Sequence, residues 1–209
     1  MLMKTTIYLI RHAKSQGNLE RRFQGRDDSP LSDLGVEQAE LLKERFAHEK
    51  IGIAYCSTLQ RSRKTAQIVF GSHKILIIGS PKFLERGFGP LDGKTIEEAK
   101  AIFPLAEDFY EGRIADIPLK GVESSQALQE RSFNALNELA LLNEGKHVAV
   151  VGHLSWIKSL LGKLTCRPFE EVMLKTRIPN CSITTLEARL ANGFPEFSVL
   201  ETGNTSHLK

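Results

Sequence analysis

The chain has 209 residues, of which 41% are hydrophobic and 25% are charged, and its formal net charge is +3. These values suit a globular protein with a sizeable core, and the mild basicity is too weak alone to imply a nucleic-acid partner. We expect one domain over residues 1–209, although two small domains would also fit. The three cysteines show no CxxC spacing. We therefore expect neither a disulfide framework nor a zinc knuckle, and a reducing cytoplasm fits best.

The N-terminal half of the chain alternates strand and helix patterns. Residues 5–10 (TTIYLI) are apolar and β-branched, which is typical of a buried strand. Residues 32–49 form a helical pattern, with Ser32 as a plausible N-cap and an apolar face made of Val36, Ala39, Leu42 and Phe46. The next predicted elements are a strand at 52–57, a helix at 59–70 and a strand at 74–79.

The second half begins with a loop over residues 80–94 that is rich in Gly and Pro. The loop ends at Thr95 and Glu98, which are spaced as a capping box and open a helix. A long helical pattern follows at 124–142, with an apolar face made of Leu128, Ala135, Leu139 and Leu142. The remaining predicted elements are strands at 147–151, 181–188 and 197–201 and a helix at 155–164.

This alternation predicts an α/β fold, a three-layer α/β/α sandwich with a mostly parallel central sheet. In open sheets of this kind, ligands bind beyond the carboxyl ends of the strands. Two of the predicted strands end directly before a histidine, His12 in YLIRH and His153 in AVVGH. A third, AYCS, runs into a helix that carries Arg61. These side chains are therefore expected to meet at one edge of the sheet.

His12 is the first candidate for chemistry. A lone histidine after a strand is more often a packed or surface residue than a catalyst. The adjacent Arg11 changes the balance, because an arginine is costly to bury unless an anion accompanies it. A neutral imidazole can accept a phosphoryl group on one nitrogen while a hydrogen bond holds the other.

Arg61, in STLQRSRKTA, lies in the first turn of its helix, where helix N–H groups also favour an anion. Its guanidinium could grip phosphate oxygens in pairs. The alternative is a solvated helix face, and this is the interpretation for Arg63 and Lys64. For His153 a structural role is about as plausible as a functional one. A nucleophile elbow at Ser155 is rejected, because GHLSW lacks the G-x-S-x-G spacing.

Glu85, in FLERGFG, is the candidate general acid. A carboxyl beside a bound phosphate dianion retains its proton more easily because of the like charge, and it could pass that proton to a leaving oxygen. The alternative is an ion pair with Arg86. The sequence has no dinucleotide fingerprint, no G-x-x-x-x-G-K-[ST] loop, no H-E-x-x-H and no calcium loop. No metal or cofactor is therefore expected.

Taken in order, these segments resemble the histidine phosphatase superfamily, the phosphoglycerate-mutase-like enzymes. RHAKSQGN is similar to the family's R-H-G-E-[ST]-x-x-N loop, and RRFQGRDDSPLSDLGVEQA to the segment that follows it. STLQRSRKTA, LERGFGPLDGKT, GVES, VVGH and the closing TGNTSHL also fall in the family's order. Each motif alone is weak, but together they cover nearly the whole chain.

The resemblance implies a phosphoglycerate-mutase-like fold and a role for each matching residue. His12 would be the phosphorylated nucleophile and Glu85 the proton donor. Phosphate would be bound by Arg11, Arg61 and His153, with help from Asn18, while Gln24 and Gly25 would line the pocket. Enzymes of this family use no metal, which agrees with protein cations taking the part that Mg²⁺ plays elsewhere.

One departure from the family pattern is Ala13-Lys14, which stands where the family usually has Gly-Glu. Ala13 is tolerable if its φ is negative and strained otherwise. Lys14 reverses a charge near the mouth of the site. It is slightly favoured as a solvated side chain, and the alternative is a preference for substrates with a second anionic group.

The compact stretch between Glu85 and His153 favours hydrolysis over mutase activity. Mutases of the family have an insertion there that helps to retain a bisphosphate, and here Arg113 and Lys120 are the few cations at its midpoint. We therefore expect a metal-independent, acid-type histidine phosphatase acting on small phosphorylated metabolites through a phosphohistidine.

Two alternatives remain open. One is a specialised family activity: phosphoglycerate mutase, sugar bisphosphatase or α-ribazole phosphatase. The other is a non-catalytic anion-binding pseudoenzyme. No nucleic-acid partner is expected, because aromatic content is only 7% and Asp27 and Asp28 lie among the nearby arginines. No membrane partner is expected either: no apolar run approaches the roughly 20 residues of a membrane span, and the N-terminal run is too short for a signal peptide. The oligomeric state is unknown from sequence.

Overall fold

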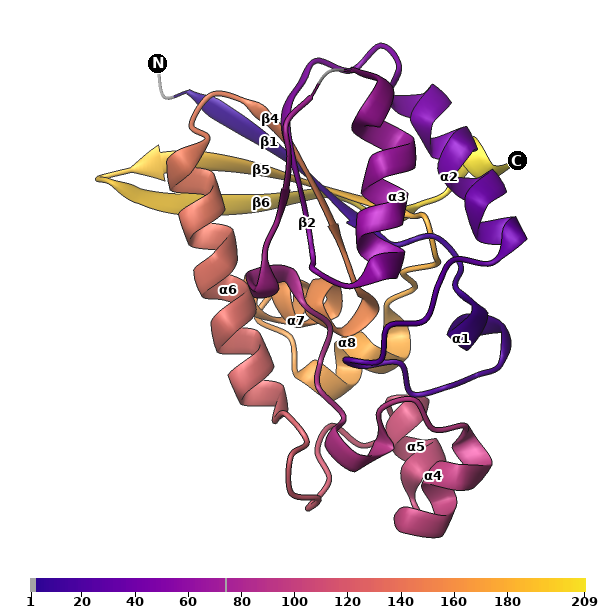
Figure 1. Ribbon diagram of the computed structural model, residues 1–209. Helices are drawn as coiled ribbons and strands as arrows, with labels where there is room; N and C mark the ends of the chain where they lie inside the picture. The colour runs from indigo at the N-terminus through magenta and orange to yellow at the C-terminus, as the bar shows by residue number, and fades with distance from the viewer. Residues whose placement is uncertain (1–2, 74) are drawn as a thin grey trace.

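The fold is built on a mixed six-stranded sheet, seen in the computed structural model, which describes residues 3–73 and 75–209 (Figure 1). The strands are β1 (Lys4–Arg11), β2 (Ile51–Cys56), β3 (Ile77–Gly79), β4 (His147–Gly152), β5 (Ile183–Ala191) and β6 (Phe194–Asn204). Their order across the sheet is β3-β2-β4-β1-β5-β6. The first four are parallel, and β5 and β6 are antiparallel additions at one edge. The α/β prediction is confirmed.

Eight α-helices accompany the sheet in the described part of the chain. They are α1 (Gln16–Leu19), α2 (Asp33–Phe46), α3 (Gln60–Phe70), α4 (Ile96–Ile102), α5 (Ala106–Tyr110), α6 (Ser125–Leu142), α7 (Leu154–Leu164) and α8 (Phe169–Lys175). Helices α2 and α3 pack together on one face of the sheet, and α6 and α7 pack together on the other. This gives the predicted three layers.

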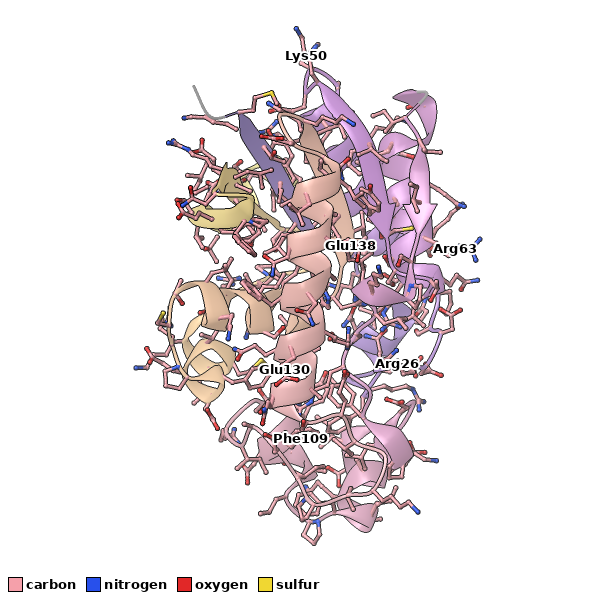
Figure 2. The ribbon with its side chains drawn as sticks, turned by 90° about the vertical axis from the view of Figure 1, so that its left-hand side faces the viewer. Arg26, Lys50, Arg63, Phe109, Glu130 and Glu138 are labelled. Carbon is pink, nitrogen blue, oxygen red and sulfur yellow. The ribbon has the colours of Figure 1, made fainter. Side chains whose placement is uncertain are left out.

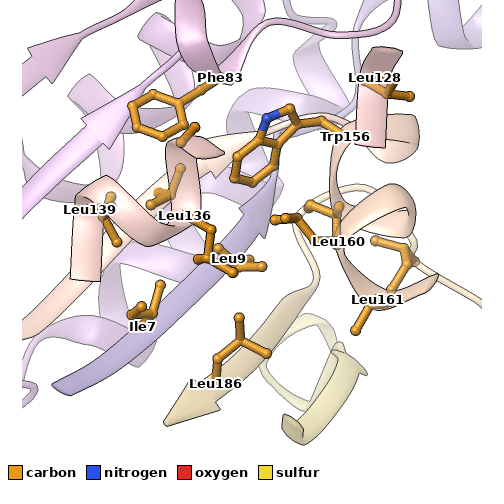
Figure 3. Close-up of a cluster of buried hydrophobic side chains, with 14 of the residues drawn as sticks. Ile7, Leu9, Phe83, Leu128, Leu136, Leu139, Trp156, Leu160, Leu161 and Leu186 are labelled. Carbon is orange, nitrogen blue, oxygen red and sulfur yellow. The ribbon is translucent and has the colours of Figure 1, made fainter. Parts of the chain in front are cut away.

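The central strand β1 shows why both faces are covered. Successive side chains of a strand point to opposite faces, so Ile7 and Leu9 pack toward α6 and α7 (Figure 3), whereas Tyr8 and Ile10 pack toward α2 and α3. Both sets are buried. The continuous apolar run of residues 5–10 is therefore the consequence of a strand that is covered on both sides.

Helix α6 has one face on the core and one in solvent. Leu128 and Leu136 are buried in the cluster around Trp156 (Figure 3), whereas Glu130 and Glu138 lie on the outer surface (Figure 2). Leu142, predicted on the apolar face, is 64% exposed because it is the last residue of the helix.

Both predicted N-caps are present. The Ser32 side chain accepts a hydrogen bond from the Gly35 N–H, and Thr95 and Glu98 form a capping box at the start of α4. Within α2, however, Val36 does not belong to the buried face, because its side chain is 39% exposed.

The edge strand β3 is shorter than predicted. A strand was expected over residues 74–79, of which residue 74 lies outside the described residues. The strand covers only Ile77–Gly79, and its three residues pair with β2 alone. In contrast, β6 is longer than the predicted 197–201, because its partner β5 supports it over eight residue pairs.

A small helical cap lies at the end of the molecule where β1 and β4 end (Figure 1). It contains α4 and α5 and has a core of its own, which is made of Phe23, Leu91, Ala99, Ala106, Phe109 and Ile117. No helix in residues 3–73 and 75–209 is long and apolar enough to cross a membrane. The cap faces the carboxyl ends of the parallel strands, where the site lies.

Candidate active site

Three parallel strands end beside one another, and each is followed directly by a polar residue of the site. His12 follows β1, Ser57 follows β2 and His153 follows β4. The backbone N–H of His12 donates to Gly152 O (2.9 Å), which brings the two histidines together with ring centroids 5.2 Å apart. The expected meeting of the strand ends is therefore found.

A cleft of about 930 Å³ opens between these strand ends and the helical cap. Every predicted site residue except His153 lines it: Arg11, His12, Lys14, Asn18, Gln24, Gly25, Arg61 and Glu85. His153 is fully buried behind His12. Arg63 and Lys64 are exposed on α3, as predicted.

The tautomer of His12 follows from its surroundings. Its Nδ1 lies 2.7 Å from Ala13 O, and a carbonyl oxygen can only accept, so Nδ1 carries the proton and Nε2 keeps a lone pair. Burial lowers the pKa of His12 well below 6.5, and the positive charges of Arg61 and Arg11 lower it further. The imidazole is therefore neutral and nucleophilic at physiological pH.

His153 is also buried and neutral. Burial lowers its pKa well below 6.5, helped by the positive charges of Arg61 and Arg11. Its Nε2 lies 2.6 Å from Ser57 Oγ, and Ser57 Oγ already accepts a hydrogen bond from Leu59 N (3.3 Å). The Ser57 hydroxyl therefore donates its proton to Nε2, and the ring proton of His153 lies on Nδ1. This Nδ1–H has no partner among the described residues. That N–H is available to an anion.

Two arginines bring positive charge that no carboxylate neutralises. Arg61 is fully buried and donates to the backbone oxygens of Asp27 (2.6 Å) and Gly25 (2.8 Å), and Arg11 donates to Ile178 O (2.7 Å). In the described part of the chain, no carboxylate lies within 4 Å of either guanidinium.

The same two guanidiniums keep unused donors. The Nε atoms of both are buried without a partner among the residues described. Burial lowers the pKa of Arg61, and it lowers that of Arg11 to about 10, so both stay charged at neutral pH. Two guanidiniums with unused donors are chemically suited to a doubly charged anion.

Glu85 lies at the N-terminus of α7. Its carboxylate accepts hydrogen bonds from the backbone N–H groups of Ser155 (3.1 Å), Trp156 (3.3 Å) and Arg86 (2.8 Å). These three donors fix the position of the carboxyl group at the start of α7.

The alternative ion pair between Glu85 and Arg86 is not present. The Arg86 guanidinium pairs with Asp116 (2.6 Å) and donates to the backbone oxygens of Ala115 and Glu123, both at 2.7 Å. It therefore ties the segment after the helical cap to the Glu85 loop and leaves the Glu85 carboxyl to α7 and the cleft.

Asn18, Gln24 and Gly25 form the polar wall of the cleft nearest His12. Asn18 Oδ1 accepts from Ser15 N and from Asn180 Nδ2, both at 3.1 Å, so the amide N–H groups of Asn18 remain available. Gly25 has φ +42°, and a Cβ there would lie 1.8 Å from Asp92 Oδ1. Only glycine fits at this position.

Ala13-Lys14 is accommodated without strain. Ala13 is fully buried and is not among the residues with positive φ, so an alanine at this position causes no backbone strain. Lys14 is half-buried and lines the cleft. No carboxylate of the described residues lies within 4 Å of its ammonium group.

Three polar residues of the site were not predicted from sequence. Ser57 stands directly after a strand, as His12 and His153 do, and that shared position was the signal. Asn180 donates to His12 O (3.1 Å) from a loop far along the chain, and Lys158 lines the cleft from α7. Nothing local in the sequence marks either of them.

No metal centre is assembled by the described residues: none of their His, Cys, Asp and Glu side chains form a group of three or more placed to hold an ion. The arrangement instead combines one nucleophilic nitrogen, two unpaired guanidiniums, a donor N–H on His153 and a carboxyl. These are the groups that transfer of a phosphoryl group requires.

The comparisons with known proteins agree with this arrangement. The chain is 30% identical over 207 residues to "Probable phosphoglycerate mutase GpmB" of Serratia proteamaculans, covering 97% of this chain and 94% of the relative. Among solved structures, Bacillus stearothermophilus YhfR superposes with a TM-score of 0.89 at 30% identity, covering 98% of this chain and all of that one.

A second solved structure is phosphoserine phosphatase from Entamoeba histolytica in complex with 3-phosphoglyceric acid. It has a TM-score of 0.81 at 26% identity and covers 98% of this chain and all of that chain. The model of the histidine phosphatase superfamily (branch 1) matches residues 7–196. The chain therefore belongs to the histidine phosphatase superfamily.

Proposed function

We propose that this enzyme is a phosphomonoesterase that hydrolyses small phosphorylated metabolites through a phosphohistidine at His12. The observation that carries the proposal is the unprotonated Nε2 of a buried, neutral His12 beside two guanidiniums that have no carboxylate partner. A bound phosphate dianion supplies the negative charge that neutralises the guanidiniums of Arg11 and Arg61.

In the bound state, the phosphate oxygens take up the unused donors of the site. These are the Nε–H groups of Arg11 and Arg61, Nδ1–H of His153 and the amide of Asn18. Arg11 and Arg61 are already held by hydrogen bonds to backbone oxygens, and His153 is held by the Ser57 hydroxyl, so little reorganisation is needed as charge shifts during the reaction.

The first step forms the bond between Nε2 of His12 and phosphorus and breaks the bond from phosphorus to the ester oxygen. Protonated Glu85 gives its proton to the leaving alkoxide. Positive charge develops on the imidazole, and the hydrogen bond from Nδ1–H to Ala13 O strengthens as it does so.

The second step returns the enzyme to its initial state. Water attacks phosphorus, Glu85 accepts a proton from that water, and the bond between phosphorus and Nε2 breaks. Phosphate leaves and His12 is again neutral. Glu85 thus acts as the acid in the first step and as the base in the second. Microscopic reversibility leads to this exchange of roles, because the second step is the reverse of the first with water in place of the alcohol.

We further propose that the reaction needs no metal ion. Arg11 and Arg61, with the Nδ1–H of His153, supply the positive charge that Mg²⁺ supplies in many phosphoryl-transfer enzymes.

Cys56 and Cys181 are buried and unbridged, and Cys166 is exposed and unbridged. Three thiols in this state support a reducing compartment such as the cytoplasm.

Mutase activity is the second candidate, favoured by the name of the Serratia relative. A mutase must hold its intermediate while the substrate reorients, whereas the cleft here is wide and the stretch from Glu85 to His153 is compact. Water can then reach the phosphohistidine, and hydrolysis is favoured. A pure anion binder would not need the Glu85 carboxyl beside the anion site.

A panel of phosphomonoesters assayed with and without EDTA tests this proposal. We expect hydrolysis of several small esters at a rate that EDTA does not change. Release of phosphate only after Mg²⁺ or Zn²⁺ is added would contradict metal independence, and transfer within the substrate without release of phosphate would favour the mutase.

Replacing Arg61 by lysine tests how phosphate is bound. Lysine keeps the charge but loses the planar fork and the hydrogen bonds to Gly25 and Asp27, so we expect kcat/KM to fall about tenfold or more. Arg63→Lys is the matched control, because Arg63 is exposed on the same helix. Wild-type kinetics for both variants would mean that Arg61 does not bind the phosphate.

A further inference from the structure

Lys158 is a buried lysine that the reaction described above does not use. It lies in the middle of α7, one turn beyond Ser155, and it is only 7% exposed. Its ammonium group donates to Met173 O at the C-terminal end of α8 (2.6 Å), and the side chain lines the cleft. An ammonium has three N–H groups, so two remain for other partners.

No carboxylate neutralises this charge. Among residues 3–73 and 75–209, no Asp or Glu oxygen lies within 4 Å of the Lys158 ammonium. Burial lowers the pKa of Lys158 to about 8, and the charge of Arg11 contributes to the decrease while that of Glu85 opposes it. The ammonium group is therefore mostly protonated at neutral pH. Burying this charge without a counter-ion costs free energy, and a bound anion would offset that cost.

Lys158 lies on the leaving-group side of the site. Glu85, the group that protonates the leaving oxygen, accepts a hydrogen bond from the N–H of Ser155, and Lys158 lies one turn further along α7, where both α7 residues line the cleft. Apolar residues of α7 and α8, among them Leu154, Phe169 and Met173, line the same cleft. An ion pair formed there is less screened than one at the surface.

The charge balance of the site leaves room for a second anion. Arg11, Arg61 and Lys158 carry three positive charges, and the phosphate dianion carries two negative ones. The first step needs Glu85 protonated and therefore neutral, while His12 and His153 are neutral as well. One of these three positive charges then remains in excess, and Lys158 lies on the helix whose N-terminus holds Glu85, the group that meets the alcohol oxygen.

We propose that Lys158 binds a carboxylate on the leaving alcohol, so that the enzyme selects phosphate esters of hydroxy acids over those of neutral alcohols. This inference rests on the proposed function and names its substrate class. Lys14, at the mouth of the cleft, is only half-buried, so water screens its charge more strongly.

Two substrate pairs test the inference, each differing only in carboxylate against hydroxymethyl. They are 3-phosphoglycerate with glycerol 3-phosphate, and phosphoglycolate with 2-hydroxyethyl phosphate. For the wild type we expect kcat/KM to favour the carboxylate member of at least one pair by about tenfold to a hundredfold. Lys158→Met should abolish that preference, mainly through KM, and Lys158→Arg should retain most of it.

The controls separate recognition from folding. Because the preference is a ratio measured on one preparation, a fraction of unfolded protein cancels. Lys163→Met replaces an exposed lysine of the same helix and should leave the preference unchanged. If Lys158 only caps α8, Lys158→Met lowers the melting temperature and keeps the preference, which would overturn the inference.

The remaining outcomes are also decisive. A wild type that hydrolyses p-nitrophenyl phosphate but shows no preference in either pair overturns the inference and leaves the proposed function intact. A wild type that hydrolyses neither p-nitrophenyl phosphate nor any of the four esters contradicts the proposed function, and the inference with it.

Discussion

Replacing His12 by alanine is expected to abolish turnover, with a loss on the order of 10⁴-fold or more. Alanine removes Nε2, which has a free lone pair in the cleft that Arg11 and Arg61 also line. Arg11, Arg61 and His153 should still bind phosphate, so binding of the anion survives while transfer does not. Steady-state kinetics and calorimetry of phosphate binding measure the two effects separately.

The fold should survive this substitution. His12 lies beside the cleft, and its side chain has a single hydrogen bond in the described structure, to Ala13 O. The melting temperature measures this, since each kcal/mol of stability that is lost lowers it by about 2–4 °C in a protein of this size. His48→Ala is the matched control, because His48 is exposed. A folded His12→Ala protein with near-normal phosphatase activity contradicts the mechanism.

Glu85→Gln should slow alkyl esters by about 10²–10⁴-fold, because glutamine can neither donate the proton to the leaving oxygen nor accept one from water. The substitution suits the site structurally. One amide oxygen can take the hydrogen bonds from Arg86, Ser155 and Trp156 that Oε1 now accepts. A loss of rate therefore reports the missing proton transfer rather than a displaced loop.

An aryl phosphate separates the two roles of Glu85. Nitrophenolate leaves without an acid, so the first step of Glu85→Gln should be largely spared while the second lacks its base. Rapid-quench kinetics should show a burst of nitrophenolate before slow turnover. Glu111→Gln is the matched control, since Glu111 lines the same cleft but is exposed. Wild-type rates of Glu85→Gln on alkyl esters would mean that another carboxyl is the acid.

Glu123, a carboxyl near the same loop, is poorly suited to replace Glu85. Burial alone would raise its pKa, but the hydrogen bond and the charge of Arg131 lower it overall. Its oxygens are also engaged by Arg131 Nε and by Gly87 N. A carboxyl held ionised in this way retains no proton for a leaving group at neutral pH.

The central part of the site could be predicted from sequence because its residues follow strand ends. A buried strand is recognisable from its apolar run, and parallel strands place their carboxyl ends at one edge, so the convergence of His12 and His153 follows from local patterns. The caps at Ser32 and Thr95 were predictable for the same reason, since capping depends on neighbours within three residues.

The rest of the site could not be predicted from sequence, because it depends on contacts between segments that are distant in the chain. The guanidinium of Arg61 is positioned by carbonyls of Gly25 and Asp27, and Glu85 is held by the first N–H groups of α7. Neither pairing leaves a trace in the local sequence. Lys158 lies within an apolar helix pattern, where a single lysine is normally taken as exposed, and only the packing of α8 against α7 buries it.

The proposed mechanism depends most on the covalent bond between phosphorus and Nε2 of His12. Mass spectrometry of Glu85→Gln, quenched in alkali during turnover of p-nitrophenyl phosphate, detects that bond directly, since phosphohistidine survives base and is lost in acid. The expected result is one phosphoryl group per chain, located on His12 by peptide mapping and absent from the Glu85→Gln protein that also carries His12→Ala. A phosphoryl group on any other residue, or a burst without covalent phosphorylation, would contradict the account.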